Sequence, residues 1–284
     1  MFDSTVGLNA AALNATEFAN LQAFVRAGGG VIAIHGATDS MQNVPWYMDL
    51  VGAGFTNHGG NAGGILIDTE SGGHVELLTA DPNHTTTGGM PARWYTVEEV
   101  YNTNRNPAEL GIVHPLVYEN EDTLVGQLGY NTGALLNSDE HAMVWCRNFD
   151  GGRSFTTNLG HSWQYASESW YQEMMLNAIQ WTAGQEYANC VTFNEVSELL
   201  AASVAAGNVN SVGNAVLSSL LAGAKAKFDA KDYTGAVSML NQFVSQAKKP
   251  ANCRSGSSCP DGGAALAKLA AKGEELIDWA QGLR

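Results

Sequence analysis

The stretch GGGVIAIHGA, residues 28–37, decides the fold of this chain. Its glycines end a helical pattern, an apolar run follows over residues 31–34, and His35 stands where that run meets a Gly-Ala turn. An apolar run without alternation is typical of a parallel strand that is buried on both faces. In open α/β sheets, ligands bind just outside the carboxyl ends of such strands. This position therefore predicts that His35 faces a crevice rather than the core.

The same alternation of helices and strands extends to about residue 184. The first helix is expected over residues 14–27, with Asn14 as its N-cap, Glu17 in a capping box, and Phe24 and Val25 on its apolar face. Residues 150–153 are typical of a tight hairpin turn. Together these patterns indicate an α/β layer fold. Further strands are expected over residues 64–67, 74–78, 95–101, 111–118, 143–146 and 154–158, and further helices over residues 47–51 and 169–182.

The composition changes near residue 184, where Ala, Leu, Ser and Lys begin to follow a helical period. We therefore expect two domains, an α/β domain over residues 1–186 and a small helical bundle over residues 190–284. Short connections favour antiparallel neighbours in such a bundle. Its helices are expected over residues 192–206, 212–230, 233–248 and 263–283.

Charge and cysteine usage exclude several classes of partner. The chain has 28 acidic and 14 basic residues among 284, a net charge of −14, which argues against nucleic acid and anionic membranes. No apolar run approaches the roughly 20 residues of a membrane span. The start of the chain lacks signal-peptide features, so any export signal would have been removed.

Cys253 and Cys259 flank a Gly/Ser loop that suggests a small disulfide and secretion, although two free thiols remain an alternative.

Several sequence blocks, in order, resemble the ThuA-like (trehalose-utilisation) family. They are AGGGVIAIH at residues 27–35, WYMDLVGA at 46–53, FTNH at 55–58, EEVYN at 98–102, HAMVWC at 141–146, and GGRSF at 151–155 leading to LGH at 159–161. The resemblance implies the flavodoxin-like doubly wound sheet of class I glutamine amidotransferases. It also implies that the family's first strands are absent here, in agreement with our expectation from the residue pattern that the chain opens on a helix. The helical part resembles the FIMAH type of C-terminal domain, which accompanies secreted carbohydrate-active proteins.

The resemblance also implies that amidotransferase chemistry has been lost. The amidotransferases of this fold carry a cysteine nucleophile at the strand-to-helix elbow, where this chain has His35. Cys146 lies within an apolar strand pattern and is a poor candidate for a nucleophile. We therefore do not expect a glutamine amidotransferase.

Three side chains are the candidate catalytic group: His35, Glu99 and His161, the last at the end of another expected strand. A carboxylate with histidines makes either an acid–base set or a divalent-metal site, and the spacing does not decide between them. The metal candidates are His35, His58 and His161. Aromatic faces and planar polar groups suit sugars. The candidate substrate-binding residues are Asp39, Trp46, His58, Tyr101, Asn102 and Arg105, and the remaining histidines are interpreted mainly as structural.

The leading hypothesis is a secreted enzyme that processes a sugar or oligosaccharide by hydrolysis, isomerisation or elimination. One alternative is a carbohydrate-binding protein without catalysis, and another is a metal-dependent glycan-active enzyme that uses a histidine cluster. The expected partner is a carbohydrate ligand. An incomplete sheet would expose an edge strand, which leaves a homodimer or a separate partner segment open.

Overall fold

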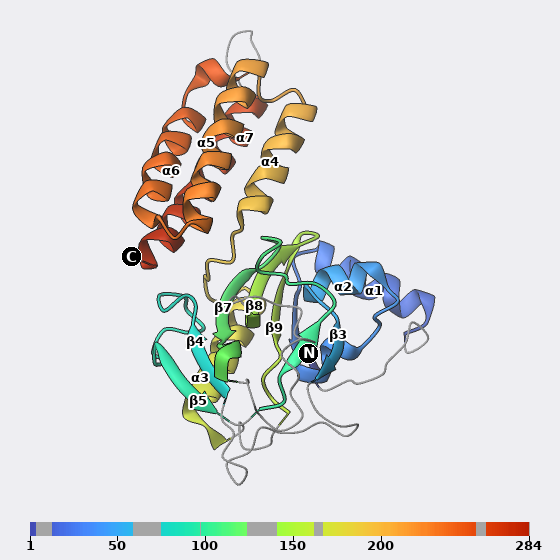
Figure 1. Ribbon diagram of the computed structural model, residues 1–284. Helices are drawn as coiled ribbons and strands as arrows, with labels where there is room; N and C mark the ends of the chain where they lie inside the picture. Colours follow the sequence, from blue (N-terminus) through green and yellow to red (C-terminus); the bar gives the residue numbers. More distant parts are fainter. Residues whose placement is uncertain are drawn as a thin grey trace. The chain divides into compact units, whose positions relative to one another are not determined.

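The chain divides into two compact units, Met1–Cys190 and Val191–Arg284, each described here by itself (Figure 1). The computed structural model describes residues 1–3, 13–58, 75–96, 98–123, 141–161, 167–253 and 260–283. The strand expected over residues 64–67 and most of the loop from Cys253 to Cys259 lie outside these residues.

A mixed sheet of seven strands forms the centre of the first unit, and its order is β1-β2-β9-β8-β7-β4-β5. The β1–β2 and β2–β9 pairs are parallel, and the remaining neighbours are antiparallel. With helices on the sheet, this confirms the α/β class. A separate antiparallel pair consists of β3 (Phe55–His58) and β6 (Tyr101–Thr103). The strands of the large sheet are β1 (Phe2–Asp3), β2 (Gly30–Ile34), β4 (Val75–Thr79), β5 (Arg93–Thr96), β7 (His114–Glu119), β8 (His141–Phe149) and β9 (Gly152–Thr157).

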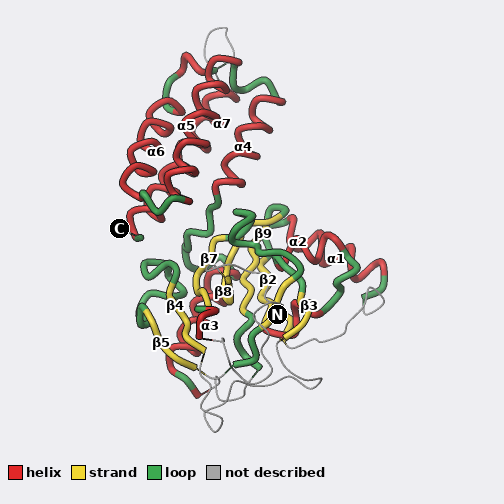
Figure 2. Tube along the Cα trace, in the orientation of Figure 1, coloured by secondary structure: helices red, strands yellow, loops and turns green. Residues whose placement is uncertain are grey.

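Strand β2 is buried on both faces, as its apolar run predicts. Val31 and Ala33 belong to one core cluster together with the buried residues of α1 (Ala15–Arg26) and α2 (Pro45–Val51). Ile32 and Ile34 belong to another cluster, which includes the buried side of α3 (Ser169–Thr182). Figure 2 shows these helices in red beside the yellow strands. Because successive side chains of a strand point to opposite faces, helices pack against both faces of β2.

Local signals account for several element boundaries. Asn14 caps α1, and its side chain and that of Glu17 form the expected capping box. At the turn from β8 to β9, Asp150 and Gly151 both have positive φ angles, of 49° and 92°, as a type I′ hairpin requires. One expectation is wrong, since Phe24 is 53% exposed rather than on the buried face of α1. The buried stripe at that end of the helix is carried by Val25 alone.

The single strand expected over residues 95–101 is also wrong, because the chain changes sheets there. Strand β5 ends at Thr96, and β6 begins at Tyr101 in the two-stranded sheet. Period-two alternation does not distinguish one strand from two short ones, so the pattern alone missed the break. The connection between them places the side chains of Glu98 and Glu99 in the interior.

The second unit contains the four helices that the sequence predicts, each within three residues of the expected bounds. Side-chain caps begin three of them, from Thr192, Asn210 and Asp232. Its core is a cluster of Leu, Val and Ala side chains with Phe and Trp residues. Within the described part of the chain, no helix has the length and apolar character to cross a membrane. The helices are α4 (Phe193–Ala205), α5 (Ser211–Asp229), α6 (Tyr233–Ala247) and α7 (Pro260–Gly282).

Candidate functional site

The parallel strands β2 and β9 place two histidines at the same edge of the sheet. His35 directly follows the end of β2, and His161 lies four residues beyond the end of β9. The carboxyl ends of parallel neighbours meet at one edge, which is where α/β folds bind ligands. His35 also has a φ angle of +45°, an uncommon conformation for a residue with a side chain. Such local strain tends to gather at functional sites.

Three ring and carboxylate atoms converge at this edge. The Nε2 atom of His35 lies 3.0 Å from Oε2 of Glu99 and 3.1 Å from Nδ1 of His161. The Nδ1 atom of His161 lies 2.8 Å from the same oxygen of Glu99. His35 and Glu99 are buried, whereas the side chain of His161 is 41% exposed. We call these three residues the His–Glu–His cluster. The structure thus brings together the three residues that the sequence nominated for catalysis.

Neighbouring groups fix the buried half of this cluster. The Nδ1 atom of His35 donates to the backbone oxygen of Asn158 at 2.7 Å, and the ring of Tyr101 lies against the His35 imidazole with centroids 4.2 Å apart. The Tyr101 hydroxyl forms a hydrogen bond with the Glu99 side chain. Burial, followed by the negative charge of Glu99, raises the pKa of Tyr101, so the phenol stays protonated and donates to the carboxylate.

Glu98 connects two of the segments that carry the cluster, and sequence reasoning missed it. Its side chain is fully buried. One carboxylate oxygen accepts from the backbone N–H of Glu99 at 2.8 Å, and the other accepts from the N–H of Gly160 at 2.7 Å. Glu98 therefore holds the segment of Glu99 against the segment that leads to His161. A signal for a buried carboxylate was present in the sequence VEEVY, where two adjacent glutamates are flanked by apolar residues. A buried carboxylate requires hydrogen-bond donors around it.

The charge of Asp39 contributes to the raised pKa of Tyr101. Burial raises the pKa of Asp39 itself, and a hydrogen bond from Gln42 opposes the rise. His58 lies opposite Tyr101 in the β3–β6 register, and its side chain is outside the described atoms. Tyr101 is therefore the predicted binding residue that contacts the cluster, and Asp39 acts on Tyr101 through its charge.

The other predicted binding residues make structural contacts. Trp46 donates to the Asp150 carboxylate at 2.8 Å and packs on the α1 and α2 side of the sheet. Arg105 donates to the backbone oxygens of Gly52 and Met48 and pairs with Asp49, which ties it to the end of α2. A carbonyl-rich helix end is a favourable partner for a guanidinium group. The remaining residue, Asn102, is buried and donates through its side chain to Asn57.

A second acidic histidine group supports the backbone of Tyr101. Nδ1 of His141 lies 2.9 Å from Glu119 and 3.0 Å from Glu121, while Nε2 donates to the Tyr101 carbonyl at 2.8 Å. Burial opposes a charge on His141, but the two carboxylates outweigh it and raise the pKa of His141 to about 10. The raised pKa favours the imidazolium form of His141, in which both nitrogens donate. This agrees with the structural role that the sequence analysis gave it.

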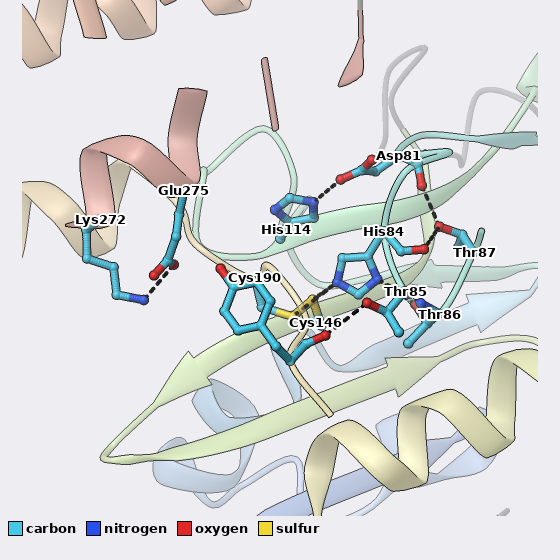
Figure 3. Close-up of a disulfide and its surroundings, with 11 residues drawn as sticks. Asp81, His84, Thr85, Thr86, Thr87, His114, Cys146, Cys190, Lys272 and Glu275 are labelled. Carbon is cyan, nitrogen blue, oxygen red and sulfur yellow. Dashed lines mark hydrogen bonds and ion pairs between the residues drawn. A yellow bond between two sulfur atoms is a disulfide. The ribbon is translucent and has the colours of Figure 1, made fainter. Parts of the chain in front are cut away.

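A disulfide joins Cys146 on β8 to Cys190 at the end of the first unit (Figure 3). The Nε2 atom of His84 lies 3.6 Å from both sulfur atoms. Burial, and then the neighbouring His114, lower the pKa of His84 to about 3, so this ring is neutral. The sequence analysis placed Cys146 correctly in an apolar strand but missed its pairing with Cys190.

The site lies on a chain whose α/β unit matches one protein family. A family model named ThuA and described as trehalose utilisation matches residues 2–182. The chain belongs to the ThuA family. Membership indicates a carbohydrate-related role. The resemblance found in the sequence blocks is thereby confirmed.

Two solved structures are similar to this ThuA chain in fold. One, described as ThuA-like, comes from Parabacteroides merdae and has 19% sequence identity, with 62% of this chain and 68% of that chain covered and a TM-score of 0.45. The other is a cytoplasmic protein from Salmonella typhimurium with 10% identity, coverage of 63% and 69%, and a TM-score of 0.39. No curated protein matches the chain. At these identities the likeness concerns the fold alone.

Proposed function

We propose that this chain is a carbohydrate-processing enzyme whose His–Glu–His cluster moves protons on a bound sugar, in hydrolysis, isomerisation or elimination. The observation that carries the proposal is the convergence of two buried groups and one exposed group within 3.1 Å. His161 is the member that meets solvent, so it is the one that contacts substrate. The family description, trehalose utilisation, supports a sugar as that substrate.

The buried pair gives His161 the surroundings that an acid–base histidine needs. A carboxylate against one ring nitrogen fixes the orientation of the ring and stabilises its charged form. Glu99 is in that position toward His161, at 2.8 Å. Tyr101 in turn holds Glu99 through its hydroxyl group, and its ring packs on His35. The side chains around the exposed imidazole are thus preorganised for proton transfer.

We also propose that the protein works in an oxidising compartment, outside the reducing cytosol. The Cys146–Cys190 disulfide supports this, because disulfides persist in secreted and periplasmic proteins and are rare where thiols are kept reduced.

The test is turnover by purified chain on trehalose and a panel of other disaccharides and free sugars, followed by NMR of the products. His161→Ala is the first variant, because its exposed side chain makes misfolding a small risk. We expect turnover to fall by about 100-fold or more with sugar binding retained, since acid–base groups typically contribute that much. Glu186→Gln, at an exposed position of the same unit, is the control and should match the wild type. A wild type that binds sugars and converts none of them would refute the enzyme and support a binding protein.

A further inference from the structure

We propose that the His–Glu–His cluster binds one first-row divalent transition-metal ion through Nε2 of His35, Oε2 of Glu99 and Nδ1 of His161. The three atoms are mutually within 3.1 Å, which is the spacing of ligand atoms around one small cation. The inference rests on the proposed function in using the same centre, but ion binding is measurable without turnover. It replaces His58 with Glu99 in the ligand set that the sequence suggested.

The three ligand atoms form a triangle, and the positions of their protons favour an ion at its centre. The carbonyl of Asn158 only accepts, so Nδ1 of His35 carries a proton that points to this carbonyl, and Nε2 is the ring atom turned toward Glu99 and His161. That nitrogen lies 3.0 Å from Oε2 of Glu99. An imidazole nitrogen holds either one proton or one lone pair in the ring plane, so the three edges of the triangle are never three separate hydrogen bonds. One cation at the centre uses all three lone pairs at once.

The partners behind the ligands match those of histidine and carboxylate ligands in metal sites. A metal-bound histidine almost always donates its other N–H to a carbonyl or carboxylate, which fixes the tautomer. His35 does this to Asn158 at 2.7 Å. A ligating carboxylate is likewise hydrogen-bonded, and Glu99 accepts a hydrogen bond from the Tyr101 hydroxyl. Both buried ligands are therefore oriented before any ion arrives.

The ligand set also defines the class of ion. Two imidazole nitrogens with one carboxylate suit zinc and iron(II), whereas calcium and magnesium take oxygen ligands. Catalytic sites of this kind keep a position open for water or substrate. The exposure of His161 places that open side toward solvent. An ion held there would take the place of a proton between His161 and Glu99 and would supply a bound water of lowered pKa.

The other two histidine clusters of the described chain differ in a way that makes them useful comparisons. In the cluster of His84, both sulfur atoms are joined in the Cys146–Cys190 disulfide, so no thiolate is available as a ligand. In the cluster of His141, Nδ1 lies against the carboxylates of Glu119 and Glu121, which raise the pKa of the ring and so favour a proton at the place where an ion would lie.

The experiment is calorimetric titration of chelator-treated full-length chain with Zn²⁺, repeated with Co²⁺ to record the visible absorption of a nitrogen- and oxygen-ligated ion. We expect one ion per chain, and a loss of affinity of about 100-fold or more in His161→Ala, because a ligand is removed. Glu99→Gln should also weaken binding. Glu186→Gln, at an exposed position of the same unit, is the control for the loss of a carboxylate and should bind as the wild type does. Thermal melts of each apo variant confirm that the chain is folded.

The outcomes separate this inference from the proposed function. Absence of stoichiometric binding, or wild-type affinity in His161→Ala, would overturn the metal site. Undiminished sugar turnover by chelator-treated chain that retains no ion would refute a part of the ion in turnover and leave the enzyme standing. A chain that binds one ion through these residues but converts no sugar supports the site and refutes the enzyme.

Discussion

Replacing Glu98 by glutamine tests whether this buried carboxylate holds the site together. Both of its oxygens accept from backbone N–H groups, those of Glu99 and Gly160. Glutamine has nearly the same shape but carries one oxygen and one NH₂ group. Whichever way the amide turns, one of the two backbone N–H groups then faces another donor. Glu98→Gln therefore keeps the packing and removes one hydrogen bond.

The size of the effect follows from the two terms that change. A hydrogen bond to a charged group contributes about 1.5–3 kcal/mol, and a buried donor left without an acceptor costs about 1–3 kcal/mol. Both contributions concern the same N–H group and are not simply added, so we expect the free energy of unfolding to fall by about 3 kcal/mol. With an m-value of about 2–3 kcal/mol per molar urea, the midpoint should fall by about 1 M.

Urea unfolding followed by tryptophan fluorescence is a suitable assay, because six of the seven tryptophans lie before residue 184. Glu186→Gln, an exposed glutamate of the same unit, is the control for the change in charge. We expect its midpoint to match that of the wild type. If Glu98→Gln unfolds within about 0.5 kcal/mol of the wild type, the two backbone contacts do not hold these segments together.

Three further predictions concern other contacts within the first unit. Tyr101→Phe should weaken Zn²⁺ binding by about 10-fold in calorimetric titration, because it removes the hydrogen bond to Glu99 and keeps the ring; unchanged affinity would exclude that role. Because the folded pKa of His141 is raised to about 10, its contribution to stability is full below its unfolded pKa of about 6.5 and is lost as pH rises toward 10, which urea midpoints across that range should record. Reduction of Cys146–Cys190, which are 44 residues apart, should destabilise the first unit by about 4 kcal/mol on the chain-entropy estimate, and an unchanged melting temperature under reductant would contradict it.

The fold was largely predictable because its signals are local. The unalternating run at residues 31–34 indicated a strand covered on both faces, and β2 has that environment. Capping residues set helix starts in both units, as at Asn14 and Asn210. The division of residues 95–101 between two sheets was not predictable, because alternation describes one strand and two short strands equally well.

Strand-end positions and family blocks predicted the grouping of His35, Glu99 and His161. These signals place residues at one edge of the sheet but do not give the contacts between their side chains. Contacts between distant segments need tertiary distances. That is why the sequence did not reveal the pairing of Cys146 with Cys190, nor the two backbone groups that Glu98 holds. Aromatic residues are equally ambiguous, and Trp46 proved to be packed with the helices of the first unit.

The disulfide also sets the route by which mechanical load enters the first unit. Cys190 is the last residue of that unit, and its covalent partner lies on β8, an interior strand of the sheet. Tension applied to the chain beyond residue 190 passes through the sulfur bridge to β8 and bypasses α3. The unit would therefore resist pulling from its carboxyl end through its interior strands, whereas after reduction the load would enter through the segment that follows α3.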